Sequence, residues 1–138
     1  MSMCKSCFLI IMVLTVTSCI GSNLTKLGVG SIVINGLVVT NGTEEPVYNF
    51  LLLVEKVQEI ISASPILAKA FFATNFPLRK YKGNRVSVTW KHRGRNWTSG
   101  NLTIKPPKDL IAGRPVTVVI VLGEHGRIST SMIHSGNL

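Results

Sequence analysis

Alternating and continuous apolar runs dominate the second half of the sequence. Residues 86–90 alternate strictly between apolar and polar side chains, residues 101–104 alternate again, and Val116–Leu122 is a continuous run of the buried type. Alternation with a period of two is typical of a strand that buries one face, and a short continuous run is typical of a fully buried strand. Gly, Pro or Asn bounds each run, and residues 123–126 are typical of a hairpin loop before a further strand over 127–133. This half of the sequence therefore predicts strands separated by turns.

The apolar run that begins at residue 32 also has the composition of a strand. Residues 32–39 are rich in β-branched side chains and lead into Thr40, Asn41, Gly42 and Thr43. The Asn-Gly pair favours a tight turn because both residues tolerate positive φ angles. Residues 47–54 are the next apolar run, so the sequence predicts two strands joined by a turn.

Residues 44–73 admit two interpretations. Glu44 and Pro46 suit the start of a helix, and Ser64 and Pro65 would open a second short helix through residue 72. Apolar side chains recur at helical spacing across the first of these segments, at Val47, Phe50, Leu51, Val54, Val57 and Ile61. A strand would instead place on one face Tyr48, Phe50, Leu52 and Val54. With two helices in 44–73 packed on an antiparallel sheet, the fold would be α+β.

The order of these motifs resembles a known layout. Gly36-Leu-Val-Val-Thr-Asn-Gly-Thr43, then Pro46-Val-Tyr-Asn49, Phe76-Pro77 and the alternating run at 86–90 are similar to the layout of immunoglobulin-like β-sandwiches in bacterial surface and periplasmic proteins. The resemblance implies an all-β fold, a two-sheet antiparallel sandwich with Greek-key connections, and it carries over no functional residue. We therefore expect one immunoglobulin-like β-sandwich domain over residues 32–138.

The first 18 residues have the pattern of a secretory signal peptide. Lys5 lies in a short front end, and an apolar run covers residues 7–16. Neither this run nor Val116–Leu122 approaches the roughly 18 apolar residues of a membrane-spanning helix. We expect residues 1–18 to be removed on export, and residues 19–31, rich in Gly, Ser, Asn and Thr, to form a tether.

The end of this segment resembles the lipobox of bacterial lipoproteins. Its residues are Val16, Thr17, Ser18 and Cys19. The resemblance implies cleavage before Cys19, a diacylglyceryl group on its sulfur and an anchor in membrane lipid, at the outer membrane or on the periplasmic side, because Ile20 carries no retention signal for the inner membrane. The alternative is ordinary signal cleavage and secretion. Cys4 and Cys7 fall within residues 1–18, so we expect no internal disulfide in the mature domain.

Four Asn-x-Thr triplets favour a different host and fate. They begin at Asn23, Asn41, Asn96 and Asn101, and each is an N-glycosylation acceptor if the protein is eukaryotic or viral. Strand-and-turn proteins enrich Asn and Thr in any case. The triplets support an alternative function, a secreted or viral glycoprotein that binds an anionic surface or a receptor.

A basic stretch is the candidate binding site. The net charge is +9, and seven basic residues fall between positions 79 and 95: Arg79, Lys80, Lys82, Arg85, Lys91, Arg93 and Arg95. Together with the aromatic residues between them they suit phosphates and other anions. Strand alternation points Lys91 away from Trp90 and His92, which favours a second interpretation, charges on the exposed face of an edge hairpin with Trp90 in the core. The expected partner is an envelope protein or anionic polymer, since nucleic acid fits the charge but not the export signal.

Motifs of catalysis and cofactor binding are missing from the sequence. The acidic residues are few, and no two of them outside the adjacent pair Glu44 and Glu45 are placed for general acid and base roles. The three histidines, at His92, His125 and His134, have no metal-ligand spacing. We therefore expect a non-catalytic binding or assembly module at the cell envelope that needs no metal and no cofactor.

Overall fold

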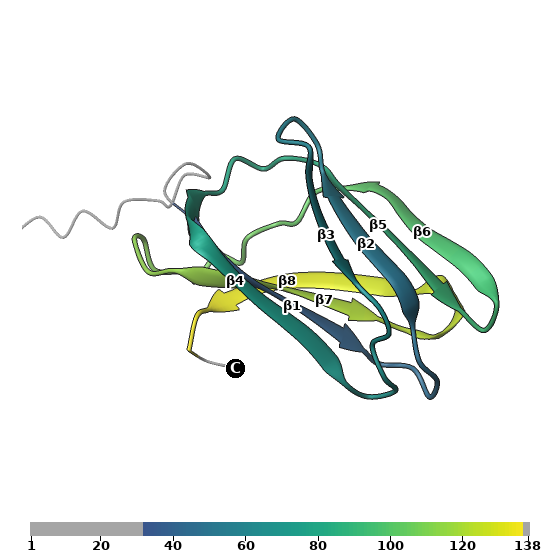
Figure 1. Cartoon of the computed structure of the whole chain (residues 1–138). Helices are drawn as coiled ribbons and strands as arrows, with labels where there is room; N and C mark the ends of the chain where they lie inside the picture. The colour runs from purple at the N-terminus through teal and green to yellow at the C-terminus, as the bar shows by residue number, and fades with distance from the viewer. Residues whose placement is uncertain (1–31, 137–138) are drawn as a thin grey trace, which may run out of the picture.

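Residues 32–136, which the computed structural model describes, form a sandwich of two four-stranded sheets (Figure 1). The first sheet has the order β4 (Phe71–Lys80), β1 (Val33–Asn41), β7 (Val116–Leu122) and β8 (Ile128–His134). The second has the order β3 (Glu59–Ala63), β2 (Tyr48–Val54), β5 (Val86–His92) and β6 (Arg95–Leu102). A short 3-10 turn, Glu124–Gly126, joins β7 to β8. The predicted all-β sandwich is confirmed, and the predicted signal peptide, Cys19 and the tether lie outside the described residues.

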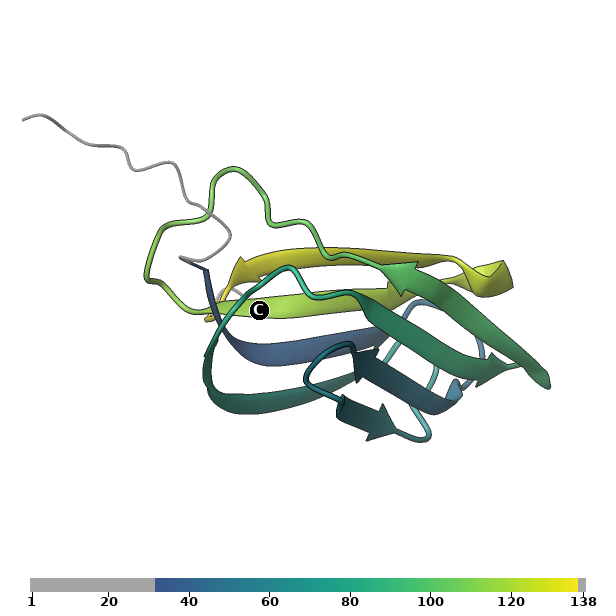
Figure 2. The same cartoon turned by 90° about the horizontal axis from the view of Figure 1, so that it is seen from above.

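One strand pair departs from the predicted antiparallel arrangement. β1 and β7 are parallel, with Val39 opposite Ile120, whereas every other neighbouring pair within the two sheets is antiparallel. The reason is the route of the chain. After β6 it leaves the second sheet, crosses through residues 103–115, and enters the first sheet in the same direction as β1 (Figure 2).

The helical interpretation of residues 44–73 is wrong. β2 and β3 form a hairpin in which Phe50 faces Ala63, and the turn between them has positive φ angles of 67° at Lys56 and 50° at Gln58. Positive φ angles interrupt a right-handed helix. The apparent helical spacing arises because β2 has apolar side chains on both faces, with Phe50 pointing into the core and Leu51 pointing outward.

Strand boundaries in the second half follow the predicted runs with one shift. β7 has the predicted bounds, whereas β6 begins at Arg95 and ends at Leu102, earlier than the alternating run at 101–104. The cause is the tight β5–β6 turn, where Arg93 and Gly94 have positive φ angles of 50° and 73°. This turn pairs Trp90 with Trp97 and so starts β6 immediately after it.

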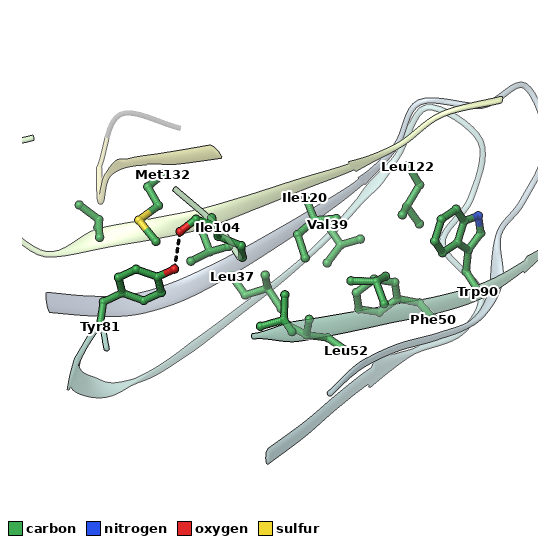
Figure 3. Close-up of a cluster of buried hydrophobic side chains, with 14 of the residues drawn as sticks. Leu37, Val39, Phe50, Leu52, Tyr81, Trp90, Ile104, Ile120, Leu122 and Met132 are labelled. Carbon is green, nitrogen blue, oxygen red and sulfur yellow. Dashed lines mark hydrogen bonds between the residues drawn. The ribbon is translucent and has the colours of Figure 1, made fainter. Parts of the chain in front are cut away.

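Apolar side chains from alternate strand positions fill the space between the sheets (Figure 3). Val39, Ile120 and Leu122 from the first sheet are fully buried, as is Phe50 from the second. Trp90 is 2% exposed and lies at the opposite end of this core from Tyr81 (Figure 3). The described domain is therefore held together by apolar burial between its two sheets.

The sandwich has two chemically different ends. We call the first the entry end: it holds Ile32, where the described chain begins, and the segments 55–58, 81–85 and 103–115 (upper left in Figure 1). The other, the hairpin end, holds the segments 42–47, 64–70, 93–94 and 123–127. Ile32 is fixed at the entry end because its carbonyl oxygen accepts a 2.8 Å hydrogen bond from the backbone N–H of Tyr81.

Candidate ligand-binding site

A cavity of about 440 Å³ lies between the two sheets near the entry end. β3 and β4, the edge strands on the same side of the two sheets, both contribute to its wall. Its volume falls within the range of about 300–1,000 Å³ that small-molecule sites occupy. Because edge strands of different sheets share no hydrogen-bond ladder, the sandwich is open along this side.

The cavity is lined mainly by apolar side chains. Leu37, Leu52 and Val118 form its floor and belong to the buried core, with exposed fractions of 2–6%. Its upper walls are only half-buried, and they include Ile34, Val54, Ile61 and Phe76. A ligand that covered these walls would remove apolar surface from water, which contributes about 0.8 kcal/mol for each buried methylene.

Tyr81 closes the cavity at the entry end. Its side chain is 8% exposed, and its hydroxyl group donates a hydrogen bond to the carbonyl oxygen of Ile104 (Figure 3). Burial raises the pKa of the Tyr81 phenol, so the hydroxyl stays protonated and able to donate. Tyr81 thereby ties the segment that follows β4 to the loop that follows β6.

Basic side chains form the rim of the cavity. Arg79 and Lys80 come from the last residues of β4, and Lys82 comes from the next segment. Arg79 is engaged, since it forms an ion pair with Glu59 and its guanidinium lies 5.4 Å from the ring centroid of Phe76. Within residues 32–136, neither Lys80 nor Lys82 has an ion pair. Two solvent-exposed cations thus border an apolar cavity.

When the strand residues that adjoin each end are included, the entry end is the more positive end of the sandwich. Its basic residues are Lys56, Arg79, Lys80, Lys82, Arg85, Lys105, Lys108 and Arg114, and its acidic residues are Glu55, Glu59 and Asp109. At the hairpin end the basic residues are Lys69, Lys91, Arg93, Arg95 and Arg127, and the acidic residues are Glu44, Glu45 and Glu124. The excess of positive charge is five at the entry end and two at the hairpin end.

The structure divides the seven predicted anion-binding residues between these two ends. Arg79, Lys80, Lys82 and Arg85 lie before β5, whereas Lys91, Arg93 and Arg95 lie at its far end. A strand with the length of β5 spans about 23 Å. The seven residues therefore form two groups on opposite ends of the molecule, which corrects the interpretation of the stretch as one site. As the alternation indicates, Trp90 and His92 are buried and Lys91 is exposed.

At the hairpin end, Arg93 already forms ion pairs with two carboxylates. The Nε atom of Arg93 lies 3.0 Å from a carboxylate oxygen of Glu45, and its Nη1 atom lies 3.5 Å from one of Glu124. A hydrogen bond from the backbone N–H of Glu44 lowers the pKa of Glu124, and the nearby charge of Arg93 lowers it further. These contacts join three turns of the sandwich and leave Arg93 less available to an external anion.

Asn41 is a structural residue, which corrects its assignment as a glycosylation acceptor. Its side chain is fully buried, and its Nδ2 atom lies within 2.8–3.1 Å of the carbonyl oxygens of Glu45, Ile66 and Leu67. Its Oδ1 atom accepts hydrogen bonds from the backbone N–H and the hydroxyl group of Thr43. The folded domain has no room for a glycan on this amide.

The other predicted acceptors have different positions. Asn96 and Asn101 lie on β6, an edge strand, and both are exposed. Asn23 lies outside the described residues, as does Cys19.

The described part of the chain holds no group of three or more His, Cys, Asp or Glu residues that could bind a metal ion. His125, next to Glu124, is exposed in the turn before β8. Among residues 32–136, no helix is long and apolar enough to cross a membrane.

The apolar walls of the cavity were not predicted as a site. Their residues, such as Val54 and Ile61, have the ordinary alternation of strands that bury one face. The only signal in the sequence was the run Arg79-Lys80-Tyr81-Lys82, which follows an apolar segment. In the structure, Tyr81 forms part of the cavity wall, and Lys80 and Lys82 lie at its rim.

No protein-family model matches the sequence, and no curated protein matches it. Among solved structures, the chain is similar to an NMR structure of a protein from Eubacterium rectale, with a TM-score of 0.36 and 13% identity over 79% of this chain and 95% of the other. At that TM-score the likeness is loose and carries no argument about function.

Proposed function

We propose that the protein is an exported, lipid-anchored, non-catalytic binding module of the cell envelope, whose site is the cavity between the sheets. The observation that carries the proposal is the cavity itself, an apolar space of about 440 Å³ whose walls are left half-exposed. Burying such walls favours an apolar or amphipathic ligand.

The position of Ile32 supports the anchored arrangement. It lies at the entry end, hydrogen-bonded to Tyr81 beside the cavity. A tether of residues 19–31 spans at most about 45 Å when fully extended. A lipid on Cys19 would therefore hold the domain near the membrane with the cavity on the side that the tether joins, at the outer membrane or on the periplasmic side.

A neutral apolar fluorophore tests the site. The protein is the chain of residues 19–138 with Cys19→Ser, and the probe is N-phenyl-1-naphthylamine, whose fluorescence rises in apolar surroundings. We expect saturable binding that is weakened in Val54→Phe, because the new ring projects into the cavity and takes part of the space that the probe needs. The matched control is Leu53→Phe, on the outward face of the same strand, which should bind like the parent chain.

Two results would reject the site. One is the absence of saturable binding to the parent chain, and the other is equal binding by Val54→Phe and the parent. Circular dichroism confirms that each variant is folded. If Val54→Phe does not fold, Ile61→Phe on β3 projects a ring into the same cavity from another strand and should weaken probe binding in the same way.

The second candidate function is a secreted glycoprotein that binds an anionic surface or a receptor. The exposure of Asn96 and Asn101 on an edge strand favours it. Intact mass of the protein from its native host, with peptide mapping, separates the two candidates. A lipid mass on Cys19 with unmodified asparagines supports the anchored module, and hexose on Asn96 or Asn101 with an unmodified cysteine supports the glycoprotein.

A further inference from the structure

We infer that the ligand of the cavity is a single-chain amphiphile with an anionic head group, whose chain enters the cavity while its head group meets Lys80 and Lys82. This inference rests on the proposed function, since it names the ligand class of the same site. It requires that the cavity interior is apolar, that the positive charges at the rim have no ion-pair partner, and that the surrounding charge attracts an anionic ligand from solution.

The interior suits a chain and excludes a charge. Its floor consists of core side chains such as Leu37 and Leu52, and an ionised group placed there would lose its hydration without gaining a partner. The apolar part of a ligand therefore occupies the interior, and its polar part stays at the rim in contact with water.

The rim suits a negative head group. Lys80 and Lys82 line the cavity, are exposed, and have no ion pair among the described residues. Arg79 is held by Glu59 over the ring of Phe76, so it shapes the rim while the two lysines remain free to pair. Because the head group keeps its water, such pairing gains attraction at little desolvation cost.

The charge of the whole entry end acts in the same direction. Its excess of five positive charges lies at the same end of the sandwich as the cavity and attracts anions from solution. A cationic head group would approach against this field. Carboxylates and phosphates share the chemistry required, so the experiment includes both.

The experiment is displacement of N-phenyl-1-naphthylamine from the chain of residues 19–138 with Cys19→Ser. The competitors are dodecanoate, dodecyl phosphate and dodecyltrimethylammonium, each below its critical micelle concentration, and dodecanol, below its solubility limit. We expect at least one of the two anions to displace the probe at about one tenth of the concentration that dodecanol requires, and the cation to be weaker than dodecanol. A tenfold difference corresponds to about 1.4 kcal/mol, the size of two exposed ion pairs.

A pair of double variants assigns the preference to the rim. In Lys80→Gln/Lys82→Gln, the concentration of the effective anion should rise about tenfold, while that of dodecanol stays the same. The matched control, Lys91→Gln/Arg95→Gln, removes two charges at the hairpin end and should change neither value. The preference for the anion should also decrease as ionic strength rises.

The outcomes separate this inference from the proposed function. If the anions and dodecanol displace the probe equally well, the head-group inference is wrong and the apolar site stands. If the parent chain binds no probe, both are wrong. If the protein binds vesicles of anionic lipid while no single-chain anion displaces the probe, the basic end is an adsorption surface and the inference is again overturned.

Discussion

Replacing the buried amide of Asn41 should destabilise the domain far more than a typical substitution of asparagine. Its side chain joins the turn after β1 to the segment before β4, through three carbonyl oxygens and Thr43. In Asn41→Ala these contacts are lost together. Each of the three carbonyl oxygens keeps one other donor: for example, the carbonyl oxygen of Ile66 still accepts a 2.9 Å hydrogen bond from the backbone N–H of Val47.

The magnitude follows from those contacts. Each lost hydrogen bond contributes about 1 kcal/mol, and the N–H of Thr43 is left buried without its acceptor, which costs about 1–3 kcal/mol more. Because the contacts share donors and acceptors, we expect a total of about 3–5 kcal/mol. In Asn41→Asp, the new carboxylate would face the same carbonyl oxygens at neutral pH. Repulsion and burial would raise the pKa of this carboxyl group, so the stability of that variant should increase as the pH falls.

Urea unfolding followed by tryptophan fluorescence measures both effects, provided that the m-value stays unchanged. Asn96→Ala, at an exposed position on β6, is the control and should cost less than about 0.5 kcal/mol. A loss below about 1 kcal/mol in Asn41→Ala would refute the structural role of the amide, because that is the value of a single ordinary hydrogen bond.

Three further substitutions test other parts of the structure. Gly126→Ala would place its Cβ atom 2.1 Å from Cε3 of Trp97 and should cost more than about 2 kcal/mol in urea unfolding, whereas Gly94→Ala has a similar φ angle of 73° but no neighbour within 4 Å and should cost only about 1 kcal/mol. The pKa of Glu124 is lowered in the folded state, so the ionised carboxylate stabilises the fold above its ordinary pKa, and this stabilisation is lost as the pH falls through the lowered value. The melting temperature of Glu124→Gln should therefore be lower than that of the parent at pH 7 and should converge with it in acid. Tyr81→Phe removes the donor to a buried carbonyl oxygen and should cost about 1–2 kcal/mol of unfolding free energy. In the parent chain, a Tyr81 phenol that titrated in the folded state with the ordinary pKa of tyrosine would contradict this burial.

The sequence was most informative where a pattern is local. β7 is apolar apart from Thr117 because it lies between β1 and β8 and is covered on its inner face, and its bounds were predicted correctly. The layout from residue 36 to 90 predicted the sandwich in spite of the helical spacing in β2. That spacing was misleading because the side chains of Leu51 and Leu53 are half-buried on the outer face, where alternation predicts polar residues.

The candidate site depends on features that no local pattern encodes. The cavity exists because β3 and β4 are edges of different sheets, a property of strand order in space. The basic stretch is continuous in sequence, but β5 separates its two halves, so that only Lys80 and Lys82 among its free cations reach the cavity. The burial of Asn41 also depends on a partner segment 25 residues away in sequence, which the triplet Asn41-Gly42-Thr43 does not reveal.

Methyl NMR of the chain of residues 19–138 with Cys19→Ser, titrated with N-phenyl-1-naphthylamine, tests the central claim most directly. Val54, Ile61 and Val118 line the cavity, whereas Val119 and Val121 lie on the outward face of β7. We expect saturable shifts at the first three residues and unchanged signals at the other two. Shifts confined to the outward valines, or no saturable shifts at all, would contradict the claim that the space between the sheets is a ligand-binding site.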